Sequence, residues 1–129
     1  MAHEPVVWII DEEQWPRACL RAELIERGYD GVGFVNVAHA LAAMGHPGMA
    51  KPCIIVLELR GLTQKRGELE GLIRYGVPII LLGGAVELNE GLVKEHEWAA
   101  VMRRPFTLGA VVDKVEKLLV VKKRTDKEA

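Results

Sequence analysis

Three short apolar runs constrain the fold of this chain more than any other feature of its sequence. They span residues 6–10, 53–59 and 77–82, and each is bounded by proline, glycine or charged residues. Runs of this length that consist mostly of Val, Ile and Leu are typical of parallel strands that are buried on both faces. Segments with helical periodicity separate the runs. This alternation predicts an α/β fold built on a parallel sheet.

Weaker signals complete the pattern. Residues 31–35 and 99–102 are expected to form two more strands, and the expected helices are 14–27, 37–44, 63–75, 87–97 and 108–119. Gly28 suits the left-handed position after the first helix, and Asn36 and Thr107 suit the N-caps of the second and the last. Five strand–helix units in succession predict one doubly wound, five-stranded parallel sheet with right-handed crossovers and helices on both faces.

Size and charge limit the classes of function. The chain has 129 residues and a net charge of −1, which predicts a single domain with no overall attraction to nucleic acid. The basic run at 122–124 divides the chain into an expected domain at 1–121 and a basic tail or linker at 122–129. No segment has the pattern of a signal peptide or the length of a membrane span. We therefore expect a cytoplasmic protein without a membrane partner.

Carboxylates mark the ends of two of the runs. Glu58 lies near the end of the run at 53–59, and Asp11 and Glu12 follow the run at 6–10. The carboxyl ends of parallel strands meet at one edge of the sheet, where ligands bind in open α/β folds. Such carboxylates suit a hard cation, and they would repel one another unless a cation or a basic side chain relieves them. Glu58 has a second interpretation, as a structural acid paired with Arg104.

The ordered set of these residues resembles the receiver domain of bacterial two-component response regulators. The residues that carry the resemblance are Asp11-Glu12 after the first strand, Glu58 at the end of the third, and Arg104-Pro105-Phe106 after the fifth. Further support comes from Gly28-Tyr29, Ala40-Leu41 and Val77-Pro78-Ile79-Ile80. The resemblance covers nearly the whole chain and implies the flavodoxin-like receiver fold.

The resemblance also implies roles for these positions. In that family an aspartate ending the third strand accepts a phosphoryl group from a kinase histidine, and the acid pair after the first strand helps to hold Mg²⁺. A lysine precedes a cis-proline after the fifth strand. Glu58 therefore stands at the phosphoacceptor position, Asp11 and Glu12 at the acid pair, and Arg104 at the lysine.

Departures from the family pattern point to an atypical receiver. Glu58 is one methylene longer than aspartate, and a displacement of about 1 Å can cost two orders of magnitude in rate. Gly83 replaces a Ser or Thr that bonds the phosphoryl group, and Val101 replaces an aromatic that rotates inward on activation. These changes predict a phosphorylation-independent signalling module that is not an enzyme. It has no catalytic residue and no cofactor, with Mg²⁺ bound weakly at most.

The expected partner surface follows from the same resemblance. Receivers commonly dock through the face made by helix 4, strand 5 and helix 5, which here spans residues 87–119. Glu95 and Arg103 give adjacent elements of this face opposite charges, which suits a protein partner, including a second copy. An ordinary solvated helix face explains the same charges. The alternative function is a flavodoxin-like small-ligand or nucleotide-binding domain that uses the crevice at the strand ends.

Overall fold

Five parallel strands form the centre of the molecule in a computed structural model that describes residues 4–60 and 65–128, with side chains described as far as Val120. The strands are β1 (Val6–Ile10), β2 (Asp30–Phe34), β3 (Ile54–Glu58), β4 (Ile79–Gly83) and β5 (Ala100–Arg103). Their order in the sheet is β2-β1-β3-β4-β5, and every neighbouring pair is parallel. The predicted fold class is confirmed.

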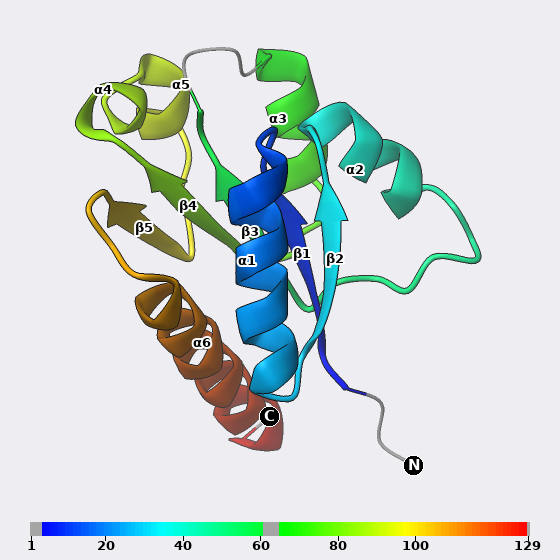
Figure 1. The fold of residues 1–129 in the computed structure, drawn as a ribbon. Helices are drawn as coiled ribbons and strands as arrows, with labels where there is room; N and C mark the ends of the chain where they lie inside the picture. Colours follow the sequence, from blue (N-terminus) through cyan, green and yellow to red (C-terminus); the bar gives the residue numbers. More distant parts are fainter. Residues whose placement is uncertain (1–3, 61–64, 129) are drawn as a thin grey trace.

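Helices cover both faces of this sheet (Figure 1). On one face lie α1 (Gln14–Glu26) and α6 (Leu108–Glu128), and on the other lie α2 (Val37–Met44), α3 (Arg66–Ile73), α4 (Ala85–Leu88) and α5 (Gly91–Lys94). Each face has its own buried cluster, because successive strand residues point to opposite sides of the sheet. Ile55 and Leu57 of β3 pack toward α2 and α3, whereas Ile54 and Val56 pack toward α1 and α6.

The central strand β3 carries Glu58 as its last residue, and all five of its residues are buried. A continuous apolar strand between two neighbours needs cover on both faces. The position of β3 was therefore predicted correctly from the apolar run. Glu58, the only polar residue of this strand, lies at the carboxyl edge of the sheet.

Local signals explain where several helices begin and end. The Asn36 side chain accepts a hydrogen bond from the backbone N–H of His39 at 2.8 Å, and the Thr107 hydroxyl accepts one from the N–H of Ala110 at 3.0 Å. Each bond satisfies a donor that the first helical turn leaves unpaired. Gly28 has φ +89°, the left-handed conformation that glycine adopts without steric cost. The three expected helix boundaries are confirmed.

The expected helix at 87–97 is wrong. Two single-turn helices, α4 and α5, replace it, and the first begins at Ala85. Between them Glu90 is extended, with φ −61° and ψ 142°. Asn89 and Gly91 flank this residue, and both favour the interruption of a helix over its continuation. The charged pattern around this break was periodic enough to predict a helix but not to predict its division.

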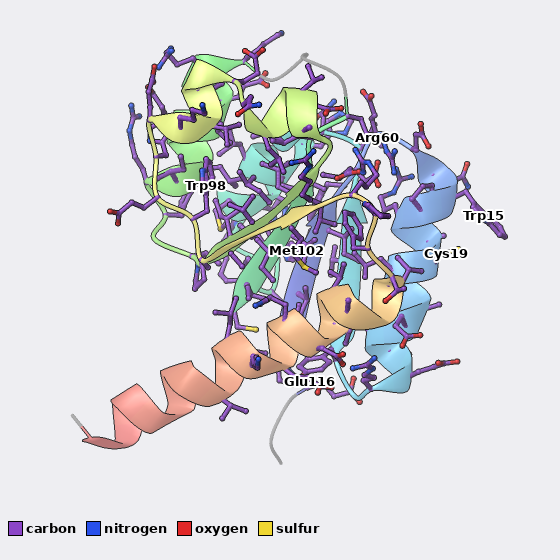
Figure 2. The ribbon with its side chains drawn as sticks, turned by 90° about the vertical axis from the view of Figure 1, so that its left-hand side faces the viewer. Trp15, Cys19, Arg60, Trp98, Met102 and Glu116 are labelled. Atoms are coloured by element: carbon purple, nitrogen blue, oxygen red, sulfur yellow. The ribbon has the colours of Figure 1, made fainter. Side chains whose placement is uncertain are left out.

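Two other expected helices differ in extent from the helices that the structure describes. The helix expected at 63–75 is present as α3, whereas residues 63 and 64 lie outside the described residues. The last helix was expected to end at 119 and continues to Glu128, so the backbone of the expected tail is helical. Figure 2 shows its final turns lying away from the sheet. The division of the chain at 121 stays a prediction.

The three tryptophans occupy three different environments. Trp8 is completely buried, with its ring 4.6 Å from that of Phe34. Trp98 is half-buried, and its indole N–H donates to the carbonyl of Val93 at 2.9 Å. Trp15 is 78% exposed and points away from the amino end of α1 (Figure 2). Among the described residues no helix is long and apolar enough to cross a membrane.

Candidate functional site

Two buried acids lie at the carboxyl edge of the sheet. Glu58 ends β3 and Asp11 directly follows β1, and each is about 5% exposed. They are the only charged residues that are fully buried in the described part of the chain. Of the three acids that the sequence predicted at this edge, Asp11 and Glu58 are therefore the two that are buried.

The first partner at this site is Arg104, which follows β5. Its Nη1 donates to Oε1 of Glu58, so the structure contains the ion pair that the sequence predicted. The Arg104 side chain is 36% exposed, and its guanidinium carbon lies 5.9 Å from the centroid of the Phe106 ring. The Arg104–Pro105 peptide bond is cis. Glu58 Oε2 is buried without a hydrogen-bond partner among the described residues.

The second partner is Arg60, which sequence reasoning missed. Its Nε donates to Oδ1 of Asp11 at 2.7 Å, and its Nη2 donates to Oδ2 of the same carboxylate at 3.1 Å. The guanidinium also lies 3.7 Å from Glu58 Oε1 and 3.7 Å from Glu13 Oε2. The hydrogen bond to Asp11 raises the pKa of Arg60 above its usual value, against the opposing effect of burial. One cation therefore faces three carboxylates.

Neighbouring elements fix Asp11 in the position that Arg60 uses. The Asp11 backbone N–H donates to the carbonyl of Phe34 at 3.0 Å, which extends the pairing of β1 with β2. The backbone carbonyl of Asp11 accepts a hydrogen bond from Nη1 of Arg17 in α1 at 2.6 Å. The side-chain Oδ1 of Asp11 also accepts a hydrogen bond from the N–H of Glu13 at 3.0 Å. The strand and the helix hold the backbone of Asp11, and the N–H of Glu13 holds its carboxylate, which then receives the bidentate guanidinium of Arg60.

Glu12 does not join this cluster. Its side chain is exposed and lines a small cavity of about 60 Å³ beside Asp11, Glu58 and Glu68. Among the described residues no three His, Cys, Asp or Glu side chains are grouped so that they could hold a metal ion. The predicted acid pair therefore contributes one buried carboxylate, Asp11, and one solvated carboxylate.

The arrangement does not fit the divalent cation that the resemblance implies. Mg²⁺ demands near-octahedral oxygen ligands. Both oxygens of Asp11 accept hydrogen bonds from Arg60, and Arg104 binds Oε1 of Glu58. This leaves Glu58 Oε2 as the one buried carboxylate oxygen that is unpartnered in the described structure. The weak Mg²⁺ binding expected from the sequence stays a prediction.

The remaining predicted positions lie around the site. Gly83 ends β4 opposite Arg103, and Val101 on β5 is 51% exposed. Glu95 is bound by Arg66 of α3, with Nη2 and Oε1 3.1 Å apart, and this hydrogen bond lowers the pKa of Glu95. Arg103 is exposed and forms no ion pair with another described residue. Of the predicted interface pair, Glu95 is therefore already engaged, and Arg103 has no ion pair among the residues that the structure describes.

A wider hollow adjoins the cluster on the side of α6. It has a volume of about 310 Å³ and is lined by Arg60, Arg104, Phe106 and Leu108 together with the two buried acids. A signal for Arg60 was present in the sequence, because a basic residue two positions after Glu58 falls at the same edge of the sheet. Without a periodic pattern, loop residues give no indication of where a long side chain will turn.

Comparisons with known proteins give one kind of match. No family model matches the chain, and no curated protein does either. Solved structures do match, and three of them represent the group. A response regulator receiver protein from Pseudomonas putida is 23% identical, with 91% of this chain and 99% of that chain covered and a TM-score of 0.74.

The other two structures extend the match to different regulators. The receiver domain of a putative LuxO repressor protein from Vibrio parahaemolyticus is 16% identical, covers 95% of both chains and has a TM-score of 0.75. The N-terminal domain of a three-domain response regulator, sensory box and GGDEF protein from Carboxydothermus hydrogenoformans is 13% identical, with 93% and 98% covered and a TM-score of 0.76. The chain therefore has the fold of a response-regulator receiver domain.

Proposed function

We propose that this chain is an atypical, phosphorylation-independent receiver domain that acts as a protein–protein interaction module in two-component signalling. One observation carries the proposal. The carboxylate at the phosphoacceptor position, that of Glu58, is bound by Arg104 and buried. A receiver that is phosphorylated needs this carboxylate as a nucleophile.

The chemistry of phosphoryl transfer supports this reading of Glu58. The attacking oxygen must lie in line with the leaving group, and positioning supplies most of the catalysis. Oε1 is occupied by Arg104, and Oε2 is buried, so neither oxygen is presented to a phosphodonor. Mg²⁺ would normally neutralise the incoming phosphate. Here the guanidinium of Arg60 binds the carboxylate expected to hold it.

The positions that would pass on a phosphorylation signal are changed as well. Gly83 offers no hydroxyl to a phosphoryl group, and Val101 is exposed where the family places an aromatic switch. The ion pairs of Arg60 and Arg104 tie the loops after β1, β3 and β5 together without a phosphoryl group. We infer that the domain keeps one conformation, and that signalling depends on whether the domain is present or on which partner it binds.

The proposed partner surface consists of α4, α5, β5 and α6, and Arg103 is an exposed cation on its strand. We propose that it binds a protein, which includes a second copy of this chain, and that the domain works in the cytoplasm without catalysing a reaction. It requires no nucleic acid, membrane or cofactor.

The test is exposure to a small acyl phosphate with Mg²⁺, followed by intact mass measurement. The wild type is expected to gain no phosphoryl group, and Glu58→Gln serves as the matched control for reaction at other sites. A stoichiometric, base-labile adduct on the wild type that is absent from Glu58→Gln would overturn the proposal.

The 310 Å³ hollow favours one second candidate, a flavodoxin-like domain that binds a small ligand or nucleotide. Its volume is at the lower limit of ligand pockets, about 300–1,000 Å³. Thermal shift measurements with nucleotides and flavins separate the two functions. A rise in Tm with one of these ligands, lost in Phe106→Ala, would favour the ligand-binding function.

A further inference from the structure

We infer that Arg60 is the resident cation of the strand-end pocket and the residue that excludes a divalent metal from it. The inference deepens the proposed function and rests on it for one point, that a receiver-like pocket would otherwise hold a metal. What it adds is a specificity-determining role for a residue that neither the apolar runs nor the family motif indicated.

The contacts of Arg60 are those that a metal ion would make. Its guanidinium binds both oxygens of Asp11 and lies within 3.7 Å of the carboxylates of Glu58 and Glu13. The planar guanidinium matches a carboxylate in a bidentate geometry that an ammonium group cannot reproduce. Arg60 is only 22% exposed, so solvent screens these contacts incompletely.

The charges of the buried cluster already balance. Asp11 and Glu58 supply two negative charges, and Arg60 and Arg104 supply two positive charges. A divalent ion would add two further positive charges to a neutral cluster. It would also have to displace a guanidinium from the same oxygen atoms, because Mg²⁺ requires several of them in near-ideal octahedral positions.

The covalent attachment of Arg60 to the chain further favours the guanidinium over a free divalent ion. Arg60 follows β3 by two residues, so its guanidinium is tethered beside Asp11 and need not be captured from solution. A short tether gives an effective concentration on the order of millimolar or more. Free Mg²⁺ must therefore compete with a cation that is present at all times.

Removal of Arg60 would leave the buried cluster with an excess of negative charge. Glu58 would keep Arg104, whereas the Asp11 carboxylate would keep only the backbone N–H of Glu13 among its described partners, with Glu12 and Glu13 next to it in the chain. Repulsion between these carboxylates would destabilise the fold, and a divalent cation would relieve it. A variant without the guanidinium should therefore acquire the metal binding that the wild type lacks.

The experiment measures Mg²⁺ binding with no phosphodonor present. Wild type, Arg60→Met and Arg60→Ala are titrated with MgCl₂ by calorimetry, and their Tm values are compared with and without Mg²⁺ at equal ionic strength. Arg60→Met keeps the aliphatic stem and serves where Arg60→Ala fails to fold. Arg74→Ala is the matched control, because it removes an exposed arginine outside the site.

The expected wild-type result is no binding heat and an unchanged Tm. Arg60→Met is expected to bind Mg²⁺ and to gain about 5 °C in Tm at ten times its Kd. A second change, Asp11→Asn, should abolish this response, and Arg74→Ala should behave as the wild type.

Submillimolar Mg²⁺ binding by the wild type would overturn the inference, and so would a folded Arg60→Met that does not respond to Mg²⁺. The proposed function fails on a different result, a phosphoryl adduct on the wild type. The two failures are therefore distinguishable.

Discussion

At the scale of single residues, Glu58 depends on the cations around it. A carboxylate that is 4% exposed has lost most of its hydration, and such a loss costs several kcal/mol unless the charge is paired. Arg104 supplies the direct hydrogen bond, and Arg60 lies 3.7 Å away as a second cation. The acid is therefore tolerated in a central strand because two arginines converge on it from separate loops.

Arg104→Ala is expected to destabilise the protein clearly. Loss of one partner of a buried pair costs about 3–5 kcal/mol, and we expect about 2–3 because Arg104 is partly exposed and Arg60 remains. Glu58→Gln combined with Arg104→Ala should recover part of this loss, as measured by urea unfolding. Arg103→Ala, the exposed neighbour, is the control and should stay within about 0.5 kcal/mol of the wild type. Strict additivity of the two changes would refute the pairing.

What the sequence could and could not reveal at this scale follows from where each residue lies. Glu58, Asp11 and Arg104 were predictable because each follows or ends a strand, and the parallel sheet brings strand ends together. Arg60 was not, because its partner depends on the path of a long side chain through a loop. Glu12 lines the small cavity as expected, but its side chain is exposed, and the sequence did not indicate that only Asp11 of the acid pair would be buried.

At the scale of elements, the region between β4 and β5 depends on anchors from outside it. Single-turn helices such as α4 and α5 are not stable alone, because nucleation of a helix is costly. Val93 is buried in the core, and Leu88 packs against the same cluster. The ion pair between Arg66 of α3 and Glu95 ties the end of α5 to the neighbouring helix.

Low pH should break the ion pair between Arg66 and Glu95. The hydrogen bond from Arg66 lowers the pKa of Glu95 from its ordinary value of about 4.5. Because the folded-state pKa is depressed, the stabilisation is complete above the ordinary value and is lost as the pH falls through the folded pKa. An NMR titration should therefore give Glu95 a pKa below 4.5 in the wild type. Arg66→Ala should return it toward that value, and Arg74→Ala should leave it unchanged. A pKa that Arg66→Ala does not move would contradict the tie.

At the scale of the whole molecule, ion pairs bridge the loops at the carboxyl edge of the sheet, whereas β5 presents exposed side chains. Val101 and Arg103 are exposed there. This architecture was predictable, because alternating apolar runs and amphipathic segments leave few topologies once crossovers must be right-handed. The length of α6 was not, because its apolar stripe was expected to end at 119, while the three lysines and Arg124 that follow still favour a helix.

If the partner of the β5 face is a second copy, the protein should form a salt-sensitive dimer. Arg103 of one copy would then meet acidic residues of the other copy. Glu90 in the turn between α4 and α5 is exposed and could serve as such a residue, whereas Glu95 is engaged by Arg66. Sedimentation across salt concentrations should show dissociation at high salt, since exposed charges are screened. Arg103→Glu should abolish the dimer and Arg74→Glu should not. A monomer under every condition would leave only a different protein as partner.

The exposure of Trp15 gives the chain a built-in optical reporter. Trp8 lies in the core and Trp98 is half-buried, so an aqueous quencher such as iodide reaches Trp15 first. Trp15 lies at the amino end of α1, four positions after Asp11. Intrinsic emission will therefore show whether a partner covers this end of the molecule, without any label being attached.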